Sequence, residues 1–91
     1  MPSNPEKLIK KHHKLIHSDN MKVTSHVQRQ SDEWIINTLL IDGYEVPFKY
    51  KRNKLYKNIE GARVNLTYYA AMENVAGFDI EVMNVVRIKI S

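Results

Sequence analysis

Cationic and aromatic side chains alternate along the segment from Phe48 to Lys57. Lysine and arginine neutralise phosphates, and aromatic rings stack on unpaired bases, so this mixture is typical of surfaces that bind single-stranded nucleic acid. Residues 48–67 carry six cations against one carboxylate, a local charge of +5, whereas the whole chain carries +4. The residues expected to make these contacts are Lys49, Lys51, Arg52, Lys54, Tyr56, Lys57 and Arg63. The alternative is a solvated basic loop whose aromatic rings belong to the core.

Two histidines, His13 and His17, are four residues apart, a spacing that places two imidazoles on one face of a helix. Two ligands do not complete a metal site. No carboxylate lies at a suitable helical spacing from both, and the neighbouring lysines disfavour a bound cation. We therefore expect no metal at these histidines.

Asp79 and Glu81 are two residues apart in a predicted strand, so they share a face on which carboxylates could divide acid and base roles. Arg87 and Lys89 are expected on the same face. An ion-pair ladder on the surface accounts for all four residues without catalysis. The carboxylates therefore do not predict an active site.

Nucleophilic and phosphate-cradling motifs are missing from the sequence. Ser25 and His26 are neighbours in a strand and point to opposite faces, so they cannot form a direct nucleophile–base pair. The chain has three glycines and no cysteine, which excludes a glycine-rich phosphate loop, thiolate catalysis and cysteine-ligated metals. We expect a protein that is not an enzyme and that binds no cofactor.

The composition is that of one small domain. Hydrophobic residues make up 43% and charged residues 26% of 91 residues, so we expect one modest core and a single domain over residues 1–91. The longest apolar run, residues 68–72, is far shorter than the roughly 20 residues of a membrane-spanning helix, and no membrane partner is expected. The basic N-terminal residues lack an apolar leader segment, which predicts a cytoplasmic protein.

An amphipathic helix is predicted over residues 4–17. Residues 4–6, Asn-Pro-Glu, are typical of a helix start, because asparagine caps, proline suits the first helical position and glutamate complements the helix dipole. Leu8, Leu15 and Ile16 share one face, which we expect to dock on apolar surface, since a helix this short is marginal alone in water.

The hydrophobic period changes to two after residues 18–20, Ser-Asp-Asn, which are predicted to end the helix. Asp42-Gly43 is predicted to form a two-residue hairpin turn with a positive φ at Gly43, and Asn84 to mark a bulge in the last strand. The five predicted strands begin at Met21, Trp34, Tyr44, Arg63 and Phe78. The residues predicted to be buried are Trp34, Val46, Phe48, Val64, Leu66, Ile80, Val82 and Ile88.

These elements predict a mainly β fold, α+β by content, in which the N-terminal helix precedes a five-stranded antiparallel small barrel over residues 21–91. The layout resembles the OB-fold, although residues 51–61 are barely long enough for the helix that usually joins its third and fourth strands. An SH3-like barrel and an open sheet covered by the N-terminal helix are the alternatives.

The sequence thus predicts a small non-enzymatic binding or accessory module. The first hypothesis is that residues 48–57 bind RNA or single-stranded DNA. The alternative is a module for protein–protein interaction or self-association, in which the N-terminal amphipathic helix contacts another protein or a second copy of the chain.

Overall fold

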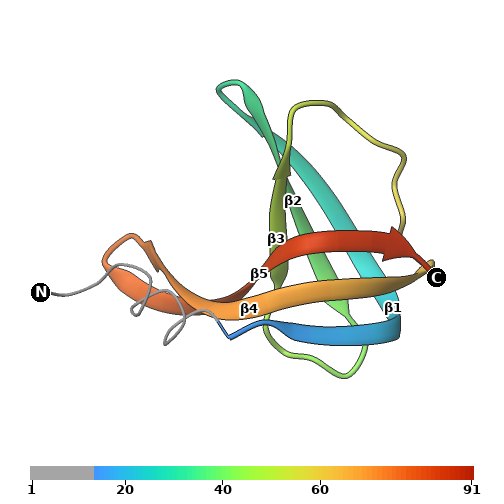
Figure 1. Ribbon diagram of the computed structural model, residues 1–91. Coiled ribbons are helices and arrows are strands. Elements are labelled where there is room, and N and C mark those ends of the chain that lie inside the picture. The colour runs from blue at the N-terminus through green and yellow to red at the C-terminus, as the bar shows by residue number, and fades with distance from the viewer. Residues whose placement is uncertain (1–13) are drawn as a thin grey trace, which may run out of the picture.

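Five β-strands account for most of residues 14–91, the part of the chain that the computed structural model describes (Figure 1). The strands are β1 (Ile16–Ser31), β2 (Trp34–Ile41), β3 (Phe48–Arg52), β4 (Arg63–Val75) and β5 (Phe78–Ile90). The described residues contain no helix, and hence no helical segment that could cross a bilayer. The fold is therefore mainly β.

The sheet closes into a ring in the order β1-β2-β3-β5-β4. β1 pairs antiparallel with both β2 and β4, so the open-sheet alternative is wrong. The expectation of an entirely antiparallel sheet is also wrong, because β3 runs parallel to β5. That pairing covers only Phe48 with Met83 and Lys49 with Asn84. Beyond these two pairs β3 and β5 diverge, and the ring has an opening between them.

Alternating side chains of the five strands fill the ring, as period-two faces on paired strands require. Of the eight residues predicted to be buried, Phe48, Val64, Leu66 and Val82 are buried, Val46 and Ile88 are half-buried, and Trp34 and Ile80 are exposed. Trp34 is exposed because it lies on the outer face of β2, opposite in parity to the buried Ile35. Ile80 is exposed because this part of β5 extends beyond the ring.

The predicted helix is wrong at its C-terminal end. Ile16 and His17 pair with β4 as the first residues of β1. Leu15 and Ile16 are 59% and 41% exposed, so they do not dock on apolar surface as expected. Residues 4–13 of the predicted helix, with Leu8, lie outside the described residues.

Ser18-Asp19-Asn20 forms an irregularity within β1 and does not end a helix. The register against β4 shifts between Ser18 and Met21, and Asn20 has a φ of 58°. The tolerance of the left-handed conformation that favours asparagine at a helix C-cap also suits it to a β-bulge. The Asn20 amide donates to Oδ1 of Asn65 over 2.9 Å, which fixes the bulge against β4.

The connection between β2 and β3 is a loop over residues 42–47, so the predicted two-residue hairpin is wrong. Gly43 does have a positive φ, 90°. However, the last pair of the β2–β3 ladder is Leu39 with Phe48, because Ile41 stays paired with β1. The Asp-Gly turn is therefore one part of a wider loop.

The tight hairpin of this fold joins β4 to β5. Ala76 and Gly77 have φ angles of 52° and 87°, and a positive φ at both central residues is what a type I′ turn requires. From Met72 to Glu81 the two strands pair only with each other. We call residues 72–81 the β4–β5 arm; it projects from the ring in Figure 1.

The last strand contains a bulge two residues beyond the predicted position at Asn84. Val85 and Arg87 pair with consecutive residues of β4, so Val86 is the extra residue. A one-residue insertion moves the side chains that follow it to the opposite face of the strand.

This change of parity explains why the predicted ion-pair ladder on β5 does not form. Asp79 and Glu81 precede the bulge, whereas Arg87 and Lys89 follow it, so the two pairs lie on opposite faces. Asp79 instead accepts a hydrogen bond from Nδ2 of Asn74 over 3.1 Å.

The connector between β3 and β4, residues 53–62, lacks the single helical turn that its length permits. Side chains of β1 hold it in place. The Ile59 amide donates to Nδ1 of His26 over 3.0 Å. Gln28 donates through Nε2 to the carbonyl of Tyr56 over 2.7 Å and accepts from the Tyr56 amide over 3.1 Å.

Candidate nucleic-acid interface

The basic-aromatic segment is the stretch from Phe48 to Lys57, and strand parity divides the part of it in β3 between two faces of that strand. Phe48 is buried in the core, and Tyr50 packs against it. Lys49 and Lys51 alternate with these inward residues along β3 and point to the outer face of the ring. The segment therefore supplies two surfaces, whereas the sequence predicts one continuous patch.

The outward side chains of three neighbouring strands form two rows on the outside of the ring. One row runs from Arg29 on β1 through Ile36 on β2 to Lys51 on β3. The second row runs parallel to it, from Val27 through Thr38 to Lys49. Neighbouring strands lie about 4.8 Å apart, so the two ends of a row are about 10 Å apart at the backbone.

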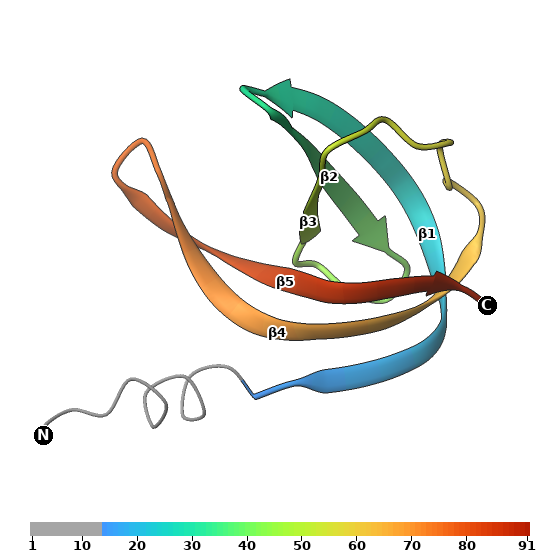
Figure 2. The same ribbon diagram turned by 45° about the horizontal axis from the view of Figure 1, so that its top comes forward.

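Five of these six residues, all except Lys51, line a hollow of about 560 Å³, which we call the outer groove. Its lining residues are Val27, Arg29, Ser31, Ile36, Thr38, Lys49 and Glu73. Glu73 comes from the β4–β5 arm, which provides the opposite wall, and it forms an ion pair with Lys49 at 2.7 Å. Figure 2 shows the β1–β2 turn and the tip of the arm projecting on the same side of the ring.

Exposed aromatic side chains are present on both projecting hairpins. Trp34 begins β2 beside the β1–β2 turn and is 45% exposed, on the same face as Ile36. Phe78 lies next to the turn of the arm and is 73% exposed. Both rings are exposed on the hairpins, although neither lines the outer groove itself.

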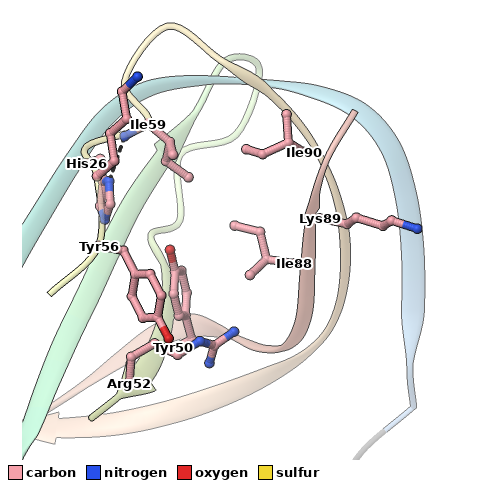
Figure 3. A pocket seen from close by; sticks show the side chains of 9 residues that line it. His26, Tyr50, Arg52, Tyr56, Ile59, Ile88, Lys89 and Ile90 are labelled. Atoms are coloured by element: carbon pink, nitrogen blue, oxygen red, sulfur yellow. Dashed lines mark hydrogen bonds between the residues drawn. The ribbon is translucent and has the colours of Figure 1, made fainter. Parts of the chain in front are cut away.

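The inward part of the segment lines a second hollow, of about 250 Å³, at the opening between β3 and β5. We call it the β3–β5 slot. In Figure 3 the rings of Tyr50 and Tyr56 lie on one side and Ile88 and Ile90 on the other. The guanidinium of Arg52 lies over the Tyr50 ring, 4.8 Å from its centroid.

The slot has an aromatic wall, and cationic residues lie near its edge. Burial raises the pKa of the Tyr50 hydroxyl above its ordinary value of 10.0, and the charge of Arg52 opposes part of that rise. Lys57 also lines the slot, whereas the Lys89 side chain points away from it in Figure 3. Tyr50 therefore remains a neutral hydrogen-bonding group at neutral pH.

Two of the predicted contact residues lie apart from these hollows. Lys54 is exposed on the connector and lines neither of them. Arg63 begins β4, which is separated from β3 by β5 in the ring, and donates to the carbonyl of Asn20 over 3.2 Å. Arg63 therefore lines neither the outer groove nor the slot, and its contact with nucleic acid stays a prediction.

His17 takes a structural position. His17 bonds through Nδ1 to the hydroxyl of Thr67 and through Nε2 to Asp19, both at 2.8 Å. Because His17 lies in a strand, the helical spacing from His13 does not apply to it. Residues 14–91 contain no cluster of three histidines or carboxylates that could hold a metal ion.

Sequence reasoning missed Arg29, Trp34, Glu73 and Phe78 as members of the site. Arg29 lies three residues after the buried His26, and Trp34 directly precedes the buried Ile35, so both have the outward parity of their strands. This parity is the signal that could have placed them outside the ring. Glu73 lines the groove, and Phe78 is exposed near the tip of the arm, because the arm extends past the ring. That extension depends on strand pairing, and no local pattern predicts it.

The chain matches no family model, and no curated protein and no solved structure shows significant similarity to it.

Proposed function

We propose that this protein is a single-strand nucleic-acid-binding module with an OB-like architecture, and that the strand lies in the outer groove. The observation that carries the proposal is the group of cations on the outer face of the ring: Arg29 and Lys49 line the outer groove, and Lys51 ends the row that begins at Arg29. The exposed rings of Trp34 and Phe78 lie on the two hairpins beside the groove. Cations that track a phosphate backbone and rings that stack on bases are the two components of such sites.

The topology supports this assignment. A five-stranded, partly open barrel with β1 paired to both β2 and β4 corresponds to the OB layout, and the parallel pairing of β3 with β5 favours it over an SH3-like barrel. OB-folds bind oligonucleotides on the face of their second and third strands, between the loops that follow the first and fourth strands. The outer groove occupies the corresponding face and is flanked by the corresponding two hairpins.

The charge of the groove predicts the character of binding. Arg29 and Lys51 are exposed, whereas Lys49 already has Glu73 as its partner. Few phosphate contacts are therefore expected, and binding is weak, salt-sensitive and tolerant of sequence.

The test is a titration with oligothymidylate and oligouridylate at low salt, followed through the fluorescence of Trp34, the one tryptophan of the chain. Saturable quenching is expected. Replacing Arg29 and Lys51 with glutamine should weaken binding and reduce the slope of log affinity against log salt by about 1.4, at about 0.7 per contact.

Arg63→Gln is the matched control, because it removes one positive charge from a strand outside the groove. It should leave the slope unchanged. Absence of saturable binding at high micromolar protein would overturn the proposal, as would an equal loss of affinity in the Arg63 variant and in a single Arg29 variant.

A protein partner is the second candidate, and the apolar surface of the arm favours it. Met72, Val75, Phe78 and Ile80 are all between 42% and 73% exposed. If oligonucleotides do not bind and the chain sediments as a dimer that Phe78→Ser dissociates, the arm is an interface between copies of the chain.

A further inference from the structure

We propose that the β3–β5 slot receives one unstacked base of the bound strand, inserted between the tyrosine pair Tyr50 and Tyr56 and the aliphatic side chains of Ile88 and Ile90. This inference rests on the proposed function, because it assigns a base-binding subsite to the same strand. This base-binding subsite differs in location from the outer groove: the slot lies on the inner side of β3, and the outer groove lies on the outer side of β3.

A small hollow lies between the outer groove and the slot and shares lining residues with both. This third hollow, of about 120 Å³, is lined by Ile36, Lys49, Tyr50, Lys51, Glu73 and Asn84. It shares Ile36, Lys49 and Glu73 with the outer groove and Tyr50 with the slot. A strand with a phosphate on Lys51 therefore lies close to the place where β3 and β5 diverge, which is the mouth of the slot.

The walls of the slot suit a flat, largely apolar ring. In Figure 3 two aromatic rings face two isoleucines across the open space, and Ile59 lies between them at one end. Tyr56 is 52% exposed, so its ring is accessible, and the Gln28 side chain fixes its backbone through two hydrogen bonds. Base stacking on such a ring needs no reorganisation of the connector.

The polar groups near the slot favour a base over a purely apolar ligand. The hydroxyls of Tyr50 and Tyr56 and the guanidinium of Arg52 are hydrogen-bonding groups that can meet the edge of a base. His26 also lines the slot, but both of its ring nitrogens already bond to Asn37 and Ile59. His26 therefore shapes the slot without contacting the edge of the base.

The experiment compares a normal oligothymidylate with an abasic oligomer that has the same phosphates but no bases. Tyr50→Leu and Tyr56→Leu remove the aromatic wall and keep apolar bulk. Each variant is expected to bind the normal oligomer about five- to a hundredfold more weakly, the range of one stacked base, and to bind the abasic oligomer as the unaltered protein does.

A composition-matched control moves the ring by one position. The double variant Leu55→Tyr with Tyr56→Leu retains every residue type, and Leu55 is 70% exposed and does not line the slot. It should bind as weakly as the single Tyr56→Leu variant. Thermal unfolding of each variant shows whether a loss of binding is a loss of folding.

The outcomes separate the two proposals. If the unaltered chain binds oligothymidylate and the folded Tyr50 and Tyr56 variants bind it equally well, the slot assignment is overturned and the groove remains. Equal affinity of the unaltered chain for the normal and abasic oligomers also overturns the slot. If neither oligomer binds the unaltered chain, both proposals are overturned.

Discussion

Nε2 of His26 lies 2.8 Å from Oδ1 of Asn37, and this hydrogen bond joins the two buried polar side chains among the described residues. The backbone amide of Ile59 can only donate, so Nδ1 of His26 accepts its hydrogen bond at 3.0 Å. Nε2 therefore carries the proton and donates to Asn37. One neutral imidazole thus links β1, β2 and the connector that forms one side of the β3–β5 slot.

Replacing Asn37 with leucine should lower the free energy of unfolding by about 1–3 kcal/mol, because it leaves the buried N–H of His26 without an acceptor. Replacing His26 with alanine should also release Ile59, so that the Ile59 amide exchanges with solvent faster. Urea denaturation and amide hydrogen exchange measure the two effects. Unchanged exchange at Ile59 in the folded His26 variant would contradict the link between this histidine and the connector.

The turn of the β4–β5 arm should be improved by asparagine. Ala76 has a φ of 52°, a left-handed conformation that costs an L-residue with a simple Cβ roughly 1–2 kcal/mol, whereas asparagine and glycine adopt it readily. Ala76→Asn creates the Asn-Gly pair that type I′ turns prefer. It should raise the thermal midpoint, and Gly77→Ala should lower it, because Gly77 has a φ of 87°. A lower midpoint for Ala76→Asn would contradict the turn type.

The two turns also show why the hairpins are only partly predictable. Asp42-Gly43 carries the stronger local signal, yet the pairing of Ile41 with β1 widens that connection into a loop. Ala76-Gly77 carries a weaker signal but joins two strands that pair along their whole length. Tertiary pairing therefore decides which turn is tight.

Much of the fold can be predicted because burial repeats with a period of two along each strand. The aromatic and β-branched residues of 34–41 predict β2 with the bounds that it has, although Asn37 and Thr38 interrupt the hydrophobic alternation. The first strand is less predictable: the sequence pattern of residues 16–20 suits a helix end, and a bulge at Asn20 together with pairing to β4 makes it part of β1. Such pairing joins residues about fifty positions apart, and local patterns do not contain it.

The candidate site is predictable in composition and not in arrangement. Local charge density points to residues 48–57, and strand parity then separates Lys49 and Lys51 from Tyr50 and Arg52. The row from Arg29 to Lys51 exists because three strands align in one register. That register is set by the pairing of β2 with both β1 and β3, which the local pattern of any one strand does not contain.

Alkaline pH should destabilise the fold through two tyrosines. Burial raises the pKa of Tyr50 and Tyr68 above 10.0; the hydrogen bond between Ser18 and Tyr68 offsets part of the rise in Tyr68, and the neighbouring Tyr44 adds to it. In the unfolded chain the hydroxyls ionise near pH 10, before those of the folded chain do. The unfolded state therefore releases protons first, and stability falls as the pH rises above about 10 until the folded hydroxyls also ionise.

The measurement is the urea midpoint of the chain between pH 8 and pH 11. The double variant with phenylalanine at positions 50 and 68 should show a shallower decline above pH 10. Tyr56→Phe, at a position that is 52% exposed, is the control for loss of a hydroxyl. An equally steep decline in the double variant and the unaltered chain would show that other groups control alkaline unfolding.

The ion pair between Lys49 and Glu73 should limit the affinity of the outer groove for nucleic acid. The two side chains are only partly buried, and while they bond at 2.7 Å the ammonium of Lys49 is shared with a carboxylate of the arm. Glu73→Gln removes that competing charge, so a phosphate can take its place. We expect tighter binding of oligothymidylate and a salt slope that is steeper by about 0.7, the contribution of one additional contact on a single strand.

Two further variants assign this gain to Lys49. Glu45→Gln removes the same charge from an exposed position in the loop of residues 42–47, so an equal gain in that variant would mean that net charge alone is responsible. Adding Lys49→Gln to the Glu73 variant should return the salt slope to that of the unaltered chain. If the gain persists without Lys49, the phosphate contact lies elsewhere, and the ion pair serves only to hold the arm against β3.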